Sequence, residues 1–423
     1  MRTSELSGFY RLSVEERLRI VKEFAGLTDE EVRILRDGIL PVEQASRMVE
    51  NVVGLMPVPI GIATNFKING RDYLIPMATE EPSVIAAASN AAKMARVRGG
   101  FFTESTPPVM IGQIQLVDPP DPEKACRDIL LAKEEIVGKA NEQDPVLVGL
   151  GGGAVGLEAR TIQTERGQMV IVHLLVDVRD AMGANVVNTM CEAVSPLLER
   201  VTGARALLRI VSNLAIYRLA RARAVFAKEA LGGEEVVEAI LDAYAFAASD
   251  IFRCVTHNKG IMNGVIALAL ATANDTRALE AGAHAYAAMG GSYRPLSRWL
   301  KTEEGDLLGE IELPVAAGVV GGATAVHPVA RVCRKILGVG SARELAEVMA
   351  AVGLANNLAA MRALATEGIQ RGHMKLHARN IAMMAGAEGE FVDLVAERMV
   401  AERKIRVDRA KEILEELRKE RGG

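Results

Sequence analysis

Four short segments of this 423-residue chain carry more acidic, basic and amide side chains than a protein core requires. They are Glu80-Glu81-Pro82-Ser83, the stretch from Thr256 to Gly264 with Lys259 at its centre, Asn274-Asp275-Thr276-Arg277, and the stretch from Gly372 to Asn380. A fixed ammonium group can stabilise negative charge that develops on an oxygen, and Lys259 has few other charges around it, unlike an ordinary surface lysine. Carboxyl and imidazole groups can transfer protons to such an oxygen. These residue types therefore suit proton transfer beside an oxyanion.

Spacing alone leaves structural alternatives open for most of these residues. Glu80 and Glu81 also lie where acidic side chains favour the N-terminal end of a helix, and Asp275 could equally cap a helix. His373 and His377 are four residues apart, as in a metal-binding pair on a helix, but no third ligand is evident, so we predict no metal site. The remaining histidines are expected to be structural: His173, His257, His284 and His327.

Two segments compete as the site for a phosphate or nicotinamide group. Gly151–Gly156 matches G-x-G-x-x-G, but that fingerprint requires a strand before it and a helix after it. The residues that follow predict a β-hairpin, so we expect a flexible turn and no Rossmann site. The better candidate is Asp180–Asn185, between a long strand and a helix that starts near Val186. Asp180 and Asn185 could cap that helix, or its free N–H groups could bind an anion.

Composition excludes several classes of protein. Lys and Arg number 50 and Asp and Glu number 54, a net charge of −4, which argues against a nucleic-acid partner. The four cysteines form no C-x-x-C pair, as in a protein of a reducing compartment. No apolar run is long enough to span a bilayer, and the first residues do not resemble a signal peptide. We expect a soluble, cytoplasmic protein with no membrane partner.

The order of the elements predicts an α+β fold with a small domain inserted into a larger, mostly helical one. Residues 1–107 and 213–367 form the two parts of the large domain, with a hairpin at Asn69–Gly70. Residues 108–212 predict the order strand, helix, strand, strand, helix, strand of a ferredoxin-like unit. Its elements are expected at Val109–Val117, Pro122–Ala140, Leu157–Gln163, Gln168–Val178, Val186–Val201 with a possible kink at Pro196, and Ala206–Ser212. Helices are also expected at Ala222–Ala248 and Ala342–Ala365, and residues 368–423 form a charged helical end.

The polar segments, together with Glu50-Asn51-Val52-Val53-Gly54 and Asp177–Asn185, resemble 3-hydroxy-3-methylglutaryl-coenzyme A (HMG-CoA) reductases, above all the class II form of bacteria and archaea. The resemblance runs essentially from end to end, in the same domain order. It implies the four-electron interconversion of (S)-HMG-CoA and (R)-mevalonate plus coenzyme A through a hemithioacetal and mevaldehyde, with two NAD(P)H. The large domain would bind the substrate, the small one the nicotinamide, and residues 368–423 would form a flap.

The resemblance also implies a role for each catalytic candidate. Lys259 would stabilise the oxyanion, and Asp275 would orient Lys259 and favour its charged form. Glu81 would supply a proton to the oxygen at the aldehyde stage. His373, on the flap, would protonate the departing coenzyme A thiolate. The reaction needs no metal.

Binding residues follow from the same resemblance. The hydroxymethylglutaryl pocket would contain Ser83, Arg253, Asn263 and Asn357, with Arg11 near the coenzyme A phosphates. The nicotinamide side would contain Asp144, Asp180, Met182, Gly183, Asn185 and Asn213. An acidic residue at Asp144 would favour a ribose 2′-OH over a 2′-phosphate, so NADH is expected to be preferred to NADPH.

The resemblance further implies a homodimer with active sites at the subunit interface, near Glu50–Gly54, and a hexamer built as a trimer of dimers. Two rival hypotheses remain: a Rossmann alcohol dehydrogenase, disfavoured by the context of the glycine motif, and a catalytically silent coenzyme A-binding regulator. The intact set of Glu81, Lys259, Asp275 and His373 disfavours the silent regulator. Whether the cell makes mevalonate or oxidises it stays open, because the same residues serve both directions.

Overall fold

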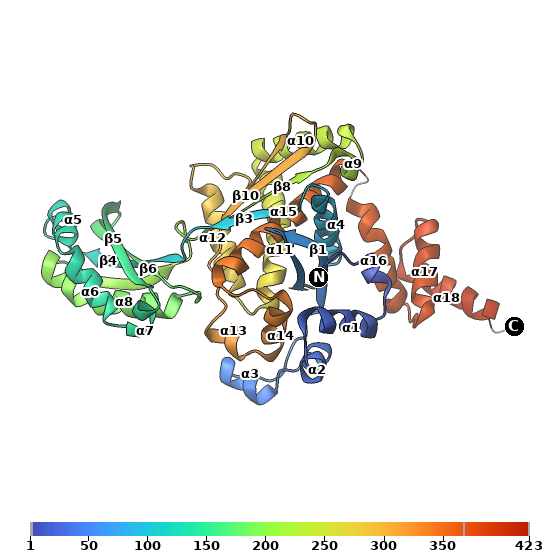
Figure 1. Cartoon of the computed structure of the whole chain (residues 1–423), viewed down its shortest axis with the longest axis horizontal. Helices are drawn as coiled ribbons and strands as arrows, with labels where there is room; N and C mark the ends of the chain where they lie inside the picture. The colour runs from blue at the N-terminus through green and yellow to red at the C-terminus, as the bar shows by residue number, and fades with distance from the viewer. Residues whose placement is uncertain (1–2, 367–368, 422–423) are drawn as a thin grey trace.

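The computed structural model describes residues 3–366 and 369–421, with side chains given for all of these except 369–376 and 421. Three regions follow one another along the long axis of the molecule (Figure 1). A four-stranded sheet with α5 to α8 forms one end, the helices α11 and α15 cross the middle, and α16 to α18 form the opposite end (Figure 1).

Short helices and a hairpin begin the chain. They are η1 (Phe9–Arg11), α1 (Val14–Ala25), α2 (Asp29–Asp37), α3 (Val42–Met48), β1 (Ile60–Ile68) and β2 (Arg71–Ala78). Capping boxes start α1 at Ser13 and α2 at Thr28, each with a glutamate three residues later. The Asn69–Gly70 hairpin is confirmed. It leads into α4 (Val84–Arg96), which packs on β1.

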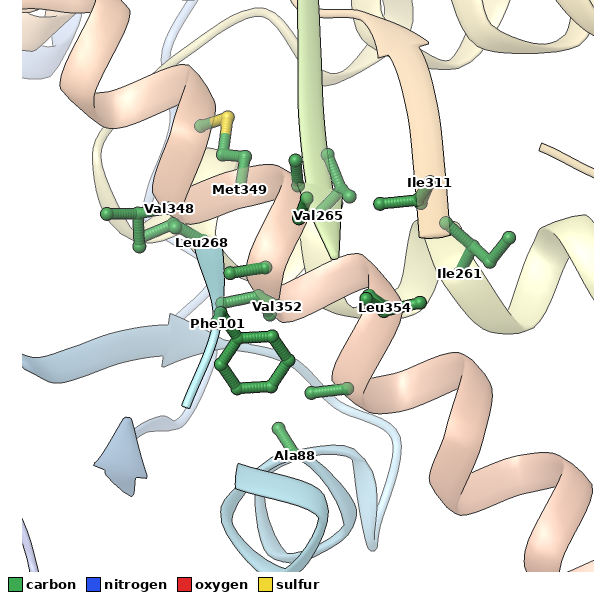
Figure 2. Packing of buried hydrophobic residues seen from close by; sticks show 14 of the residues in the cluster. Ala88, Phe101, Ile261, Val265, Leu268, Ile311, Val348, Met349, Val352 and Leu354 are labelled. Atoms are coloured by element: carbon green, nitrogen blue, oxygen red, sulfur yellow. The ribbon is translucent and has the colours of Figure 1, made fainter. Parts of the chain in front are cut away.

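Two long helices form the centre of the large region. They are α11 (Ile251–Ala271) and α15 (Ala342–Ala365), and they pack together through residues such as Val265, Leu268 and Val352 (Figure 2). Among the described residues, α15 alone is long and apolar enough to cross a membrane by length and composition, but 67% of that stretch is buried inside the protein. Burial of this kind is typical of a core helix.

A second sheet, in the order β3-β8-β10-β9, covers this core. Its strands are β3 (Phe102–Ser105), β8 (Leu219–Phe226), β9 (Ser297–Lys301) and β10 (Leu307–Pro314). The surrounding helices are α9 (Lys228–Leu231), α10 (Glu234–Ser249), α12 (Thr276–Ala288), α13 (Gly322–Val326) and α14 (Pro328–Leu337).

The predicted helix at Ala222–Ala248 is wrong over its first part. Residues up to Phe226 belong to β8, and α10 begins only at Glu234. The reason is a period of two: Ala220, Ala222 and Ala224 are buried, whereas Arg221 and Arg223 between them are exposed. The many alanines favour a helix by propensity, but burial of alternate residues selects a strand.

The small sheet has the order β5-β6-β4-β7, with every neighbouring pair antiparallel. Its elements are β4 (Val109–Val117), α5 (Pro122–Leu131), α6 (Lys133–Asn141), α7 (Pro145–Gly149), β5 (Gly153–Thr164), β6 (Gly167–Asp177), α8 (Ala184–Thr202) and β7 (Arg205–Ser212). They follow the predicted order, although the first helix is divided at Ala132 and α8 continues through Pro196. The hairpin of β5 with β6 is confirmed, but the flexible turn predicted for the glycine motif is wrong beyond Gly152, because residues from Gly153 onward already pair with β6.

The last three helices pack around a core of their own. They are α16 (Ile369–Met384), α17 (Glu390–Ala401) and α18 (Val407–Arg421), joined through Ala382, Val395, Met399 and Ile413. They lie at the far end from the small sheet (Figure 1). Arg409 adds ion pairs to Glu402, Glu412 and Glu416.

Candidate active site

Three polar side chains meet where α11 passes the end of β2. Lys259 Nζ donates to Glu81 Oε2 at 2.6 Å, and Asn263 Nδ2, one helical turn later, donates to Glu81 Oε1 at 3.3 Å. The Lys259 side chain is 56% exposed and that of Glu81 37% exposed. The cluster therefore joins residues about 180 positions apart in the sequence. It lies at the protein surface, where a small molecule can reach it.

Glu81 is placed by the tight turn between β2 and α4. Its backbone N–H donates to Thr79 Oγ1 at 3.1 Å. Ser83 then adopts a left-handed conformation with φ 74°, which is uncommon outside glycine and asparagine, and its hydroxyl forms no cap on α4. The carboxylate of Glu81 consequently faces Lys259. Spacing alone had left open that Glu81 only favours the N-terminal end of a helix, and the contact with Lys259 adds a second role.

A groove of about 330 Å³ begins at Ser83 and runs between α4 and α15. Its walls are rich in alanine, with three polar residues, Ser83, Asn90 and Arg362. The full lining is Ser83, Ala86, Ala87, Asn90, Ala91, Met94, Leu358, Ala359, Arg362 and Ala363. Small residues on both helices leave room for a narrow, extended ligand beside the Glu81 turn.

A buried polar network fixes the opposite face of α11. His257 Nε2 lies 2.7 Å from Ser297 Oγ, and Asn357 Oδ1 accepts hydrogen bonds from Ser297 Oγ and Trp299 Nε1, both at 2.8 Å. Burial, together with the nearby positive charge of Arg253, lowers the pKa of His257 to about 4. Asn357 is 1% exposed. The structure thus places this predicted pocket residue inside the core, where it supports the helix that carries Lys259.

Of the other predicted catalytic residues, only Asp275 has a described side chain, and it bonds residues outside this cluster. Asp275 caps α12, its Oδ1 accepting from the N–H groups of Arg277 and Ala278 at 3.0 and 3.1 Å. It forms no ion pair with Lys259 in the part of the chain that the structure describes. His373 has its backbone in α16, and its side chain lies outside the described residues.

Two predicted arginines have no acidic partner among the described side chains. Arg253 uses its backbone N–H to bond Asp250 Oδ1 at 2.7 Å and leaves its half-buried guanidinium unpaired. Arg11 ends η1, is exposed, and stacks its guanidinium 5.3 Å from the centroid of the Tyr10 ring. Both are therefore available to an anionic ligand.

The loop Asp180–Asn185 leaves the start of α8 open. Gly183 is the N-cap residue with φ 100°, and no side chain caps the helix. A Cβ at Gly183 would lie 2.5 Å from Val178 Cγ1, so only glycine fits this turn. The capping role considered for Asp180 and Asn185 is wrong: Asp180 Oδ1 accepts from the Ala342 N–H at the start of α15, and Asn185 is exposed in the first turn of α8. Uncapped N–H groups at a glycine turn fit the phosphates of a dinucleotide.

The remaining nicotinamide candidates are Met182, which belongs to this loop, and Asn213 and Asp144, which lie outside it. The carbonyl oxygen of Met182 accepts from Arg218 Nη1 at 3.1 Å. Asn213 is exposed in the segment after β7. Asp144 caps α7 through Leu147 N–H at 2.9 Å, on the side of the small sheet where β5 begins.

Comparison with known proteins identifies the family. The family model for hydroxymethylglutaryl-coenzyme A reductase matches residues 13–378. This chain belongs to that family. It is 63% identical over 416 residues to the 3-hydroxy-3-methylglutaryl-coenzyme A reductase of Archaeoglobus fulgidus, covering 98% of this chain and 95% of that protein. It is 37% identical over 365 residues to the probable reductase of Borreliella burgdorferi, covering 84% and 82%.

Solved reductases share the fold. The enzyme of Streptococcus pneumoniae matches with a TM-score of 0.83 at 40% identity, covering 97% of this chain and 99% of that one. A class II structure of the same enzyme, bound to NADPH in open conformations, matches with a TM-score of 0.82 at 40% identity, covering 96% and 100%. The predicted family, the mixed helix and sheet class, and an NAD(P)H-dependent oxidoreductase activity are thereby confirmed.

Proposed function

We propose that this protein interconverts HMG-CoA and mevalonate plus coenzyme A, with Lys259 and Glu81 at the reacting centre. The observation that carries the proposal is the cluster of Lys259, Glu81 and Asn263 beside the groove that starts at Ser83. A reduced nicotinamide supplies hydride when bound, and the remaining steps are carried by side chains of the chain itself.

Lys259 and Glu81 divide the work on the substrate oxygen. The Lys259 ammonium stabilises the oxygen of the thioester carbonyl as negative charge develops on it, and later the oxygen of the aldehyde. The carboxyl group of Glu81 gives that oxygen a proton at the aldehyde stage. Asn263 holds Glu81 Oε1 by a hydrogen bond of 3.3 Å, so Oε2 faces Lys259.

Two further residues act at the edges of this centre in the proposed mechanism. His373 protonates the coenzyme A thiolate as it leaves, which prevents its return to the aldehyde. Asp275, at the start of α12 and close to the end of α11, turns its carboxylate toward Lys259 when ligand is bound and favours the charged ammonium. The role of Asp275 requires its carboxylate to move from the α12 cap described above.

Substrate binding is assigned to two arginines without an acidic partner and to three polar residues. The Arg253 guanidinium pairs with the free carboxylate of the hydroxymethylglutaryl group, and Ser83 and Asn263 bind its polar atoms. Arg11 meets the coenzyme A phosphates. Asn357 contributes through the buried network that supports α11.

The cofactor binds at the Asp180–Asn185 loop, with NADH preferred. Met182, Gly183 and Asn185 present the open start of α8 to its phosphates, and Asp180 fixes the loop. Asn213 lies on the nicotinamide side. One carboxylate oxygen of Asp144 caps α7, and the other remains for a ribose 2′-OH and repels a 2′-phosphate.

A homodimer with active sites between its subunits, assembled further into a trimer of dimers, completes the proposal. Its support is the segment Glu50–Gly54 and the residues after it: Val53 is fully exposed and Met56 is 86% exposed in the single chain. Neighbouring exposed apolar side chains of this kind are typical of a protein–protein contact surface. The ferredoxin-like small domain and a cytoplasmic location belong to the same proposal.

Absorbance of the reduced nicotinamide tests the function. Wild-type protein should oxidise NADH with HMG-CoA and, separately, with mevaldehyde, and Lys259→Ala should lose both reactions. A protein that binds coenzyme A but consumes NADH with neither substrate would instead be the silent regulator.

A further inference from the structure

A buried arginine links the small sheet to the large region directly beneath the proposed cofactor loop. Arg218 is 4% exposed, and its guanidinium donates to two backbone carbonyl oxygens, that of Met182 at 3.1 Å and that of Ala317. No carboxylate among the described residues forms an ion pair with it. Burial lowers the pKa of Arg218 to about 10, although the negative charges of Asp177 and Asp180 oppose this. A cation buried without an ion pair costs stability, so a role beyond stability is expected.

The segment from Val315 to Val320 holds the same loop from the large region. The N–H groups of Val319 and Val320 donate to the Asp180 carbonyl oxygen at 2.9 and 3.3 Å. Gly318 lies so close that a Cβ there would be 2.5 Å from Met182 N. Together with the bond from Ala342 N–H to the Asp180 carboxylate, these contacts fix the loop on several sides.

This connection reaches the catalytic side of the molecule. The Gly318 N–H donates to Asn274 Oδ1 at 2.7 Å. Asn274 directly precedes Asp275, in the short turn between α11 and α12. The loop that receives the cofactor is therefore tied through Gly318 to the end of the helix that carries Lys259.

We propose that Arg218 is a positioning residue for the nicotinamide cofactor. It turns the Met182 carbonyl oxygen inward, which removes a repulsive oxygen from the anion-binding start of α8 and leaves the helix N–H groups facing outward. It also sets the loop in register with Lys259 and Glu81. The inference rests on the proposed function and adds a residue that lies outside the Asp180–Asn185 motif and does not touch the cofactor.

Titration of the whole protein with NADH and NADPH, followed by fluorescence, tests the proposal. Arg218→Met removes the charge and both hydrogen bonds. Its dissociation constant for either dinucleotide should rise about tenfold, equivalent to about 1.4 kcal/mol, while KM for HMG-CoA at saturating dinucleotide stays within about twofold. Arg218→Lys keeps the charge, and its dissociation constants should lie between those of the wild type and those of Arg218→Met. The matched control is Arg96→Met, which removes a partly buried guanidinium bonded to Asp72 at the end of α4 and should leave the dissociation constants unchanged.

A second variant keeps the test decisive if Arg218→Met fails to fold. Gly318→Ala leaves Arg218 intact but displaces the backbone at Met182, so it should weaken dinucleotide binding in the same way. Hydrogen exchange at residues 181–187 should be faster in both variants without ligand. Wild-type affinity and unchanged exchange in the folded variants would overturn the proposal. If wild-type protein binds neither dinucleotide, the proposed function is wrong, whatever the Arg218 variants do. Failure of the proposed function is thereby distinguished from failure of the Arg218 proposal.

Discussion

Lys259 and Arg218 are both cations near the proposed reaction, but the regions around them are built differently. Lys259 lies at an exposed rim with a carboxylate partner, Glu81, at 2.6 Å. Arg218 is enclosed between two regions and is bonded to backbone carbonyls that cannot move independently of the fold. A side chain that can exchange its partner for a substrate oxygen is suited to chemistry, whereas one bonded to fixed backbone is suited to placing a loop. Variants of the two regions should therefore fail in different ways.

The largest effect is expected from Lys259→Ala. Loss of the ammonium removes the main stabilisation of the developing oxyanion, so kcat with HMG-CoA and with mevaldehyde should fall about 10³-fold. The side chain is 56% exposed, so the thermal midpoint should change little. Steady-state kinetics and a thermal melt check both statements. A folded variant that retains a tenth of wild-type kcat would remove Lys259 from the reacting centre.

Glu81→Gln should have the next largest effect. The amide keeps the shape of the side chain but cannot give up a proton as a carboxyl group does, so kcat for mevaldehyde reduction should fall about 10²-fold. The control is Glu80→Gln, because Glu80 is exposed and directly precedes Glu81. Equal losses in the two variants would favour a general effect on the turn over proton donation by Glu81.

The sequence predicted the exposed region better than the buried one. Lys259, Glu81 and Asn263 lie in polar segments that stand out from their apolar surroundings, and the structure brings all three together. The hairpin at Asn69–Gly70 and the strand Val109–Val117 were predictable from local turn residues and alternation.

Contacts between distant segments gave no such local signal. Arg218 bonds residues 36 and 99 positions away, and nothing around it in the sequence differs from an ordinary basic strand. Asn357 matched a pocket position, but its bonds to Ser297 and Trp299 place it in the core. Asp180 was considered as a cap of the next helix and instead bonds the start of α15, 162 residues later. Such pairings depend on tertiary packing, which overrides local preference.

The buried His257 should make the stability of the protein depend on pH. Because burial holds its pKa at about 4, against 6.5 for an unhindered histidine, the unfolded chain binds a proton more readily between these values. The contribution of His257 to stability is complete above pH 6.5 and is lost as the pH falls toward 4. The free energy of unfolding should therefore fall by about 2 kcal/mol between pH 7 and pH 5 because of His257.

Urea unfolding at the two pH values measures this loss. His257→Gln cannot be protonated, so its stability should fall less between pH 7 and pH 5 than that of the wild type, whatever its stability at pH 7. A His257→Gln protein with the full wild-type dependence would show that other buried groups cause it.

The smallest effect is expected from a change at Asp144, whose side chain both caps α7 and, in the proposed function, selects NADH over NADPH. Asp144→Ser retains an N-cap oxygen for Leu147 N–H and removes the negative charge, so α7 should persist while repulsion of a 2′-phosphate disappears. The ratio of kcat/KM for NADH to that for NADPH should exceed one in the wild type and fall about fivefold in the variant, or about 1 kcal/mol. Asp121→Ser makes the same change at the cap of α5, where the carboxylate accepts from Lys124 N–H, and should leave the ratio unaltered. A ratio that responds equally to both variants would mean that net charge of the small sheet region, and not a contact at Asp144, selects the cofactor.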